Sequence, residues 1–470
     1  MHTSTTSTVP LEPWSATELA EATQGYWYLD QVPQGEIKRI LTDSRHAELG
    51  DAFLALKGER FDAHDFVVQV AENGCQIAIV SHPVEANICQ LVVENTRLAL
   101  GHLGAAYRRA QHPQLKVIAL TGSSGKTTTK EMLGSILTRL APTLITRGNL
   151  NNDLGVPMML LELRSEHQYA VMELGASHQG EIDYTSNLVQ PQVAGILNIG
   201  TAHLGEFGGR DGICRAKSEI YRHIDQTGTS IVPAGDDFTD TIRLAIQTEH
   251  SLSFGNGGEV FATDIQLLAQ SAIFTLNTPQ GSKVVNLPFA GAHNVHNAEA
   301  ATAFALAIGI ALEDIVAGLE SAQGAKGRLN FIHKNNHLFI DDTYNANPTS
   351  IRAAAEVLAQ QQGIKVMVIG DIGELGNTAA QQHYMLGRDL VSVSGMDFVI
   401  AVGEFAPATQ EGARSTQYGK KLQAFLNQEQ ALPLLLSLIK THQPQSMSFL
   451  FKGSRYTHME TLMADLMEKV

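Results

Sequence analysis

A short loop rich in glycine and serine carries the residues best suited to chemistry in this chain. It reads Thr121-Gly122-Ser123-Ser124-Gly125-Lys126-Thr127-Thr128. Glycines let backbone N–H groups curl around an anion, and the first turn of a following helix adds unpaired donors and a positive dipole end. Lys126 would then reach the β- and γ-phosphates of a nucleotide, and the Thr127 hydroxyl would ligate Mg²⁺. The loop therefore predicts a nucleotide site.

The flanking residues support this interpretation over an ordinary serine–glycine turn with Lys126 in solvent. Residues 117–120 form an apolar run that fits a buried strand, and apolar residues recur at helical spacing over 132–140. The general pattern G-x-x-x-x-G-K-[ST] has glycine where this chain has Leu120. The shorter form still keeps the glycine cradle, the lysine and the metal-binding hydroxyl.

Size, charge and cysteine content limit the class of protein. At 470 residues the chain suggests about three domains, and its net charge of −15 argues against a nucleic-acid partner. The three cysteines lack metal-ligand spacing and fit idle thiols in a reducing compartment. The N-terminal stretch is not a signal peptide, and the nearly apolar run 300–312 is too short to span a bilayer. We expect a cytoplasmic monomer without an integral membrane segment.

The order of predicted strands and helices indicates an α/β protein of three domains. Residues 1–96 form a small first α/β domain, 97–326 a central domain with a mostly parallel sheet, and 327–470 a third α/β unit. Within the central domain, residues 260–287 alternate like antiparallel strands and predict a small side sheet. The further strand candidates are 143–146, 169–172, 193–198, 338–340, 365–369, 397–402 and 448–451.

Ligands of parallel sheets lie beyond the carboxyl ends of the strands, so we expect the site residues in the loops that follow the strands. This rule places Glu173 and His203 at the same sheet edge as Lys126. A carboxylate suits Mg²⁺, whereas His203 alone is a polar loop histidine and Lys217 alone a surface lysine. Polar loops also end the strands of the third unit, so we expect the reaction in a cleft between two domains.

Two polar stretches leave alternatives open on the residues alone. Thr42-Asp43-Ser44-Arg45 is either a solvated turn or a grip for a diphosphate. In the stretch 291–297, Asn294 and Asn297 either cap the following helix or turn an amide toward a base edge.

Several motifs together resemble the Mur ligases of peptidoglycan synthesis, over nearly the whole chain. In chain order they are T-G-S-S-G-K-T-T, G-N-L-N-N-D-L-G-V-P, M-E-L-G-A, H-N-x-x-N, G-R-L and D-D-T-Y-N-A-N-P. The motifs A-L-K-G-E-R-F-D-A-H-D-F, Y-N-A-N-P-x-S and K-G-S-R are most similar to the branch that adds D-alanyl-D-alanine. The D-N-P-R motif, which recognises diaminopimelate in the family's ligase of the preceding step, is absent.

This resemblance implies a UDP-binding first domain, a central ATP-binding domain and a Rossmann-like C-terminal ligase domain. It implies ATP and Mg²⁺ as cofactors, and UDP-N-acetylmuramoyl-tripeptide and D-alanyl-D-alanine as substrates. The peptide carboxylate would attack the γ-phosphate of ATP, and the dipeptide amine would then attack the resulting acyl phosphate.

Matching motifs also imply roles for single residues. Asn297 would meet the adenine, Arg328 the phosphates and Asp342 the ribose, with Tyr344 as a further nucleotide contact. The implied metal ligands are Thr127, Glu173, His203 and Lys217, the last as the lysine that the family carbamylates. The implied catalytic residues are Lys126, Lys217, His203 and Arg328. The implied substrate contacts are Asp43, Ser44 and Arg45 for the uridine diphosphate, Asn149 and Asn152 for the muramoyl group, and Asn345, Asn347, Lys452, Ser454 and Arg455 for the dipeptide.

One segment departs from the family pattern, and two other functions compete. Relatives often carry V-x-N-A-D-D, but this chain reads I-V-P-A-G-D-D with Pro233, so we predict no function for the segment. A related amide ligase such as folylpolyglutamate synthetase would need no UDP-binding domain. A phosphate-loop regulator or small-molecule kinase would turn over ATP without an amine co-substrate.

Overall fold

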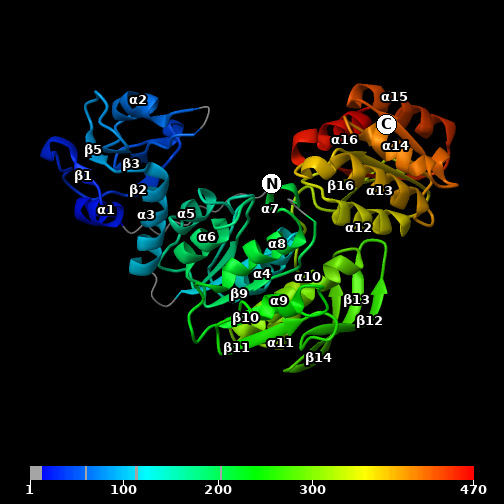
Figure 1. Cartoon of the computed structure of the whole chain (residues 1–470), viewed down its shortest axis with the longest axis horizontal. Helices are drawn as coiled ribbons and strands as arrows, with labels where there is room; N and C mark the ends of the chain where they lie inside the picture. Colours follow the sequence, from blue (N-terminus) through cyan, green and yellow to red (C-terminus); the bar gives the residue numbers. More distant parts are fainter. Residues whose placement is uncertain (1–12, 59–60, 112–114, 202–203) are drawn as a thin grey trace. The chain divides into compact units, whose positions relative to one another are not determined.

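The computed structural model in Figure 1 describes residues 13–58, 61–111, 115–201 and 204–470. The chain divides into two compact units. Met1–Ala119, Ala141–Gly175 and Asp183–Pro191 form the first, and Leu120–Leu140, Ala176–Ile182 and Gln192–Val470 form the second. Four sheets with intervening helices confirm the predicted α/β fold. The domain boundaries at 96/97 and 326/327 stay a prediction.

The N-terminal sheet has five strands in the order β1-β5-β4-β3-β2, with β1 antiparallel to β5 and the remaining pairs parallel. Its strands are β1 (Tyr26–Trp27), β2 (Arg39–Leu41), β3 (Asp51–Leu54), β4 (Ile77–Val80) and β5 (Cys89–Val92). The helices of this part are α1 (Ala16–Thr23), α2 (Val67–Glu72) and α3 (Thr96–Gln111). Strands β3 and β4 are wholly buried. The apolar run of β4 is typical of a strand inside a parallel sheet, and the one charged residue of β3, Asp51, is paired with Arg39.

The central sheet has six strands in the order β11-β10-β9-β6-β8-β7. They are β6 (Lys116–Thr121), β7 (Thr143–Ile145), β8 (Tyr169–Glu173), β9 (Val193–Ile196), β10 (Thr229–Pro233) and β11 (His250–Phe254). The helices are α4 (Lys126–Thr138), α5 (Gly155–Leu160), α6 (Glu181–Val189), α7 (Leu204–Phe207), α8 (Arg210–Ser218), α9 (Thr239–Arg243), α10 (Ala292–Ala307) and α11 (Leu312–Glu320). The predicted strand–loop–helix order at residues 117–140 is confirmed, because β6 leads directly into α4 through the glycine-rich loop.

The predicted side sheet is also present. It consists of the antiparallel strands β12 (Phe261–Leu267), β13 (Ala272–Thr278) and β14 (Gly281–Leu287). Along β13 the residues Ala272, Phe274 and Leu276 are buried and alternate with half-buried residues, as expected of a sheet covered on one face.

The C-terminal sheet has the order β15-β16-β20-β17-β18-β19, in which only the β15–β16 pair is antiparallel. Its strands are β15 (Asn330–Lys334), β16 (His337–Asp342), β17 (Ile364–Gly370), β18 (Phe398–Val402), β19 (Leu422–Phe425) and β20 (Met447–Lys452). The helices are α12 (Pro348–Ala359), α13 (Ala379–Ser392), α14 (Ala406–Arg414), α15 (Gln428–Thr441) and α16 (Met459–Glu468).

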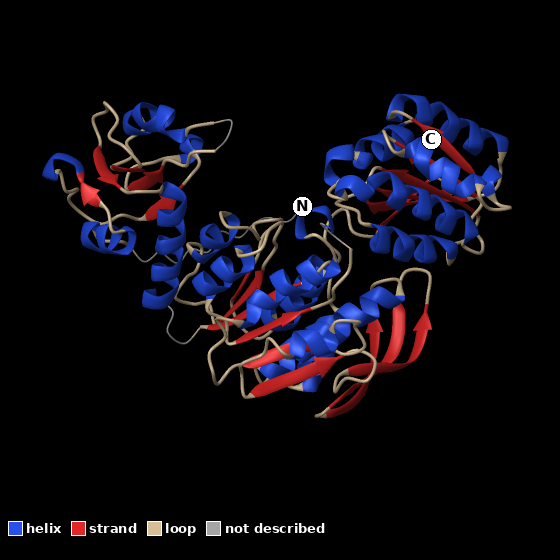
Figure 2. Cartoon of the chain, viewed as in Figure 1, coloured by secondary structure: helices blue, strands red, loops and turns tan. Residues whose placement is uncertain are grey.

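Helices cover both faces of the C-terminal sheet, as Figure 2 shows. On β17, Met367 packs with Leu386 of α13, whereas its neighbour Val366 packs with Leu435 of α15. Alternate residues of one strand thus enter two separate cores, which is the arrangement of a Rossmann-like domain. None of the described helices is both long and apolar enough to cross a bilayer.

Candidate active site

The phosphate loop between β6 and α4 is held in a shape that requires glycine at one position and favours it at another. Gly125 has φ +79°, and a Cβ there would lie 2.3 Å from Asn297 Oδ1. A Cβ on Gly122 would lie 2.9 Å from the Cβ of Leu197. The left-handed backbone and the nearby Asn297 side chain therefore require glycine at position 125, and the close approach of Leu197 favours it at position 122.

Asn198, in the loop that follows β9, fixes the phosphate loop through a paired amide contact that sequence reasoning missed. Its Oδ1 accepts from Ser124 N at 3.0 Å, and its Nδ2 donates to Ser124 O at 3.1 Å. The backbone N–H of Ser123 donates to Asn198 O at 3.2 Å. Both polar groups of the Ser124 backbone are thus satisfied before any ligand binds.

Two cations lie at the loop, one from the loop itself and one from a distant part of the sequence. Lys126 Nζ donates to Gly122 O at 2.8 Å, so its ammonium lies over the loop itself. Arg328, 201 residues beyond Thr127, donates from Nη2 to Thr127 Oγ1 at 2.9 Å. Its guanidinium also stacks on Tyr344, with 4.5 Å between Cζ and the ring centroid. These contacts bring together five of the predicted nucleotide residues: Gly122, Lys126, Thr127, Arg328 and Tyr344.

This arrangement fits the triphosphate of ATP. The Nε of Arg328 is buried and has no hydrogen-bond partner among the described residues. A buried donor without an acceptor is costly, and an anionic oxygen would satisfy it. The glycine cradle, the two cations and this donor together form a site for phosphate groups.

Asn297 lies against the loop and does not cap its helix. Helix α10 has Gly291 at its N-cap and no side-chain capping bond, so the capping alternative is wrong. Instead Asn297 Nδ2 donates to Asn294 Oδ1 at 3.0 Å, and Asn294 Nδ2 donates to Ala290 O at 2.8 Å. The contact of Asn297 with adenine stays a prediction.

The predicted magnesium ligands include a buried lysine and a buried carboxylate. Lys217 lies on α8 with 3% of its surface exposed, and burial, aided by the nearby Lys126 ammonium, lowers the pKa of Lys217 well below its ordinary value. An ammonium cannot ligate a cation, but a neutral amine can react with carbon dioxide to give an anionic carbamate. Lys217 therefore fits a metal only in its carbamylated form.

Glu173, at the end of β8, is held in place by a side-chain amide. Only 2% of its surface is exposed, and its Oε1 accepts from Asn151 Nδ2 at 2.8 Å. Carboxylate and hydroxyl oxygens, as in Glu173 and Thr127, are the ligands that Mg²⁺ prefers. His203, the fourth predicted ligand, lies outside the described residues.

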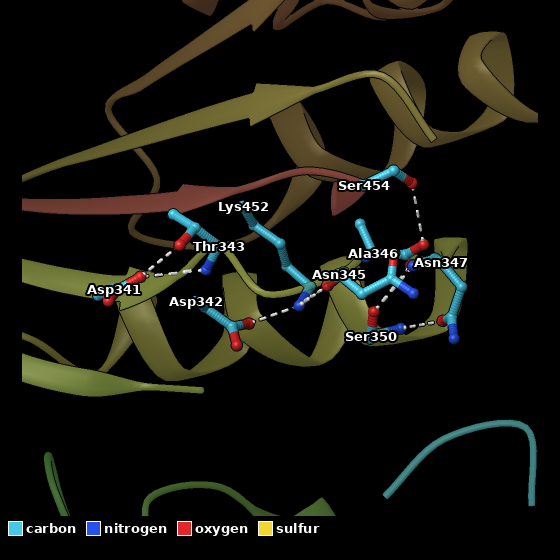
Figure 3. A network of polar contacts seen from close by, with 9 residues as sticks. All are labelled: Asp341, Asp342, Thr343, Asn345, Ala346, Asn347, Ser350, Lys452 and Ser454. Carbon is cyan, nitrogen blue, oxygen red and sulfur yellow. Dashed lines mark hydrogen bonds and ion pairs between the residues drawn. The ribbon is translucent and has the colours of Figure 1, made fainter. Parts of the chain in front are cut away.

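A network of polar contacts joins the predicted dipeptide residues at the carboxyl ends of β16 and β20 (Figure 3). Lys452 Nζ donates to Asp342 Oδ2 at 2.7 Å and to Asn345 O at 3.0 Å. Burial raises the pKa of Asp342, although Lys452 opposes this effect. Ser454 Oγ accepts from Gly373 N at 2.8 Å. The structure thus pairs Asp342, predicted for the ribose, with Lys452, predicted for the dipeptide.

Two further predicted dipeptide contacts have structural partners of their own. Asn347 forms a capping box with Ser350 at the start of α12, which fixes the entry of that helix. Arg455 is largely exposed, and its Nη1 lies 2.9 Å from Glu460 Oε1. Their roles toward a substrate stay predictions.

The residues predicted to contact the sugar nucleotide lie in exposed turns. Arg45 donates from Nε and Nη2 to the Asp43 carboxylate, at 2.9 and 2.6 Å, and this pairing lowers the pKa of Asp43. Ser44 begins the turn between them. Asn149 is exposed, and Asn152 Oδ1 accepts from Gly155 N at 2.8 Å at the start of α5. The turn alternative and the diphosphate alternative for Arg45 both remain open.

Three models of one protein family match this chain. The Mur ligase family catalytic domain matches residues 36–119, the Mur ligase middle domain 120–305, and the Mur ligase glutamate ligase domain 327–455. The chain belongs to the Mur ligase family. This Mur ligase is accordingly an ATP-dependent ligase, and the regulator and kinase alternatives are excluded.

Relatives of this Mur ligase extend the match to nearly its full length. It is 42% identical over 433 residues to the UDP-N-acetylmuramoyl-tripeptide–D-alanyl-D-alanine ligase of Escherichia coli, covering 91% of this chain and 93% of the relative. A crystal structure of MurF from Acinetobacter baumannii is 74% identical, with a TM-score of 0.95 over 98% of this chain and 100% of that one.

Two more distant solved structures are also similar to this Mur ligase. MurF of Thermotoga maritima, solved in complex with ADP, is 27% identical with a TM-score of 0.80, covering 92% of this Mur ligase and 98% of that chain. The folylpolyglutamate synthase of Mycobacterium tuberculosis is 17% identical with a TM-score of 0.64, over 79% of this chain and 95% of that one. That likeness extends to the fold alone.

Replacing Gly125 with alanine should weaken ADP binding by at least tenfold. The added Cβ would strain the left-handed backbone and meet the Asn297 amide, and the strain alone costs about 1–2 kcal/mol. Gly257→Ala is a matched control, since Gly257 has φ +81° and nothing within 4 Å of its Cβ position. Calorimetric titration with ADP should show the loss in Gly125→Ala only; equal affinities would contradict the proposed role of the loop.

Proposed function

We propose that this Mur ligase joins D-alanyl-D-alanine to UDP-N-acetylmuramoyl-tripeptide at the expense of ATP. The product is the UDP-muramoyl-pentapeptide of peptidoglycan synthesis. The observation that carries the proposal is the convergence of Lys126 and Arg328 on the phosphate loop, in a chain that aligns over 91% of its length with a ligase of that name. We place the reaction in the cytoplasm, where its co-substrate ATP is available.

The chain's own residues explain how a carboxylate is activated. A carboxylate is a poor acyl donor, so the tripeptide carboxylate first attacks the γ-phosphate of ATP, giving an acyl phosphate and ADP. Negative charge gathers on the transferring phosphoryl group. Lys126, in the loop, and Arg328, beside it, stabilise this charge. The stacking of Arg328 on Tyr344 and its bond to Thr127 fix the guanidinium in advance, so little reorganisation is needed.

Magnesium would be held by three oxygen ligands and one imidazole nitrogen. Thr127, Glu173, His203 and carbamylated Lys217 are the proposed ligands. When bound, the metal would supply positive charge that neutralises the phosphate oxygens. Burial of Glu173 and Lys217 keeps their side chains out of bulk water, which strengthens their interaction with a cation.

The second step forms the amide bond. The amine of D-alanyl-D-alanine attacks the acyl carbon, and inorganic phosphate leaves with one oxygen of the original carboxylate. We propose that Asn345, Asn347, Lys452, Ser454 and Arg455 bind the dipeptide. Asp43, Ser44 and Arg45 would bind the uridine diphosphate, and Asn149 and Asn152 the muramoyl group. Asn297 and Asp342 would bind the adenosine.

Omitting one substrate at a time tests the function. Phosphate release should require ATP, UDP-N-acetylmuramoyl-tripeptide and D-alanyl-D-alanine together, and mass spectrometry should find one new UDP-muramoyl-pentapeptide per ADP. Glutamate with a pteroyl acceptor serves as the comparison pair, because the competing amide ligase would use it. Turnover with that pair, or phosphate release that does not depend on the dipeptide, would overturn the proposal.

A further inference from the structure

The segment Ala234-Gly235-Asp236-Asp237, for which we predicted no function, holds both polar groups of the Ile199 backbone. Ile199 N donates to Asp236 Oδ2 at 2.9 Å. Ile199 O accepts from Arg210 Nη2 at 2.8 Å, and Arg210 Nη1 in turn lies 2.8 Å from Asp237 Oδ2. Two adjacent carboxylates thus fix one peptide unit, the first directly and the second through an arginine.

Ile199 stands between two residues that grip the phosphate loop. Asn198 pairs its side-chain amide with the Ser124 backbone, and Gly200 N donates to Ser123 Oγ at 2.9 Å. The position of Ile199 therefore sets the position of both contacts to the loop.

The supporting segment is itself rigidly held. Asp236 Oδ1 accepts from Phe238 N at 2.9 Å, which closes a turn directly after β10. The Arg210 guanidinium lies over the Phe238 ring, with 5.0 Å between Cζ and the ring centroid. The contacts of Asp236 and Arg210 thus form a chain that runs from the turn after β10 through Ile199 to Ser123 and Ser124.

We propose that Asp236 and Asp237 are positioning residues for the phosphate loop. Neither is among the predicted ATP contacts; they act through Ile199 by fixing Ser123 and Ser124, so that the loop has its phosphate-binding shape before the nucleotide arrives. A loop that must first reorganise binds its ligand more weakly, so their loss weakens nucleotide binding. The inference rests on the proposed ATP site at this loop.

The two carboxylates should differ in the size of their effect. Asp236 accepts a backbone N–H with a charged oxygen, and the loss of such a bond corresponds to about a tenfold change in affinity. Asp237 is 73% exposed in its ion pair with Arg210, and exposed pairs contribute little. We therefore expect Asp236→Ala to raise the dissociation constant of ADP about tenfold, and Asp237→Asn to raise it no more than about threefold.

Asp225→Ala is the matched control for Asp236→Ala. Asp225 also closes a turn, since its Oδ1 accepts from Thr227 N at 2.9 Å and from Thr227 Oγ1 at 2.8 Å, but it has no bond to Ile199. Both variants lose a turn, so both should show a similar fall in melting temperature. Only Asp236→Ala should lose ADP affinity and show a raised KM for ATP, with the KM for the UDP-linked substrate unchanged.

Calorimetric titration of the full chain with ADP and Mg²⁺ decides between the outcomes. Asp236→Asn keeps one acceptor oxygen, so its ADP affinity should lie between that of the unmutated chain and that of Asp236→Ala. If Asp236→Ala does not fold, Asp236→Asn is tested in its place. Equal ADP affinity in Asp236→Ala, Asp236→Asn and Asp225→Ala would overturn the inference. An unmutated chain that does not bind ADP would instead refute the ATP site on which the inference depends.

Discussion

Replacing Lys126 with alanine is expected to lower the rate of ligation about a thousandfold while leaving the fold intact. The Lys126 ammonium lies over the phosphate loop through its bond to Gly122 O. No other lysine of the loop can take its place at the γ-phosphate, because the remaining loop residues are glycine, serine and threonine. Phosphate release under saturating substrates measures the effect.

The matched control is Arg139→Ala, which removes an exposed cation just beyond the other end of helix α4. That variant should turn over ATP at the unmutated rate. Circular dichroism and melting temperature should be similar for the two variants, since Lys126 is only partly buried. Turnover of Lys126→Ala within a few fold of the unmutated chain would refute a phosphate-gripping role for the loop.

Replacing Lys217 with alanine should lower ligation by about a hundredfold or more, and added bicarbonate should not restore it. The physical reason is that alanine has no amine from which a carbamate can form, so the proposed metal ligand is lost for good. Rates measured over a series of Mg²⁺ concentrations should show that higher metal concentration compensates only in part.

Arg215→Ala provides the comparison for Lys217, because Arg215 lies two residues earlier on helix α8 with an exposed side chain. It should retain full activity at every bicarbonate concentration. If Lys217→Ala matches the unmutated chain, or if bicarbonate revives it, the carbamate assignment is wrong.

Local pattern was enough to predict the two elements that flank the phosphate loop. The apolar run before Thr121 and the helical spacing after Lys126 depend only on neighbouring residues, and β6 and α4 appear where they were expected. The side sheet at 260–287 was predictable for the same reason. Apolar and polar residues that alternate along a strand indicate a sheet with one buried face.

Other elements escaped prediction because tertiary contacts decided them. Strand β10 ends in Pro233, a residue that weakens a strand signal, yet pairing with β9 and β11 on both sides holds it in the sheet. The role of Asn198 was equally hidden, because its partner Ser124 lies 74 residues away. Spacing along the chain carries no information about such a pair.

The predicted site residues of the third domain illustrate the same limit. Their loops could be located from the polar residues that follow each strand. That Lys452 pairs with Asp342, 110 residues earlier, could not be read from the sequence, because the contact exists only once β16 and β20 lie side by side.

In the proposed reaction the tripeptide carboxylate is activated by accepting the γ-phosphoryl group of ATP. This activation can be tested with UDP-N-acetylmuramoyl-tripeptide labelled with ¹⁸O in the reacting carboxylate. After ligation, the released inorganic phosphate should carry one ¹⁸O atom per molecule of pentapeptide formed, because the oxygen bridging carbon and phosphorus leaves with the phosphate. Phosphate free of label, with pentapeptide still formed, would contradict this account.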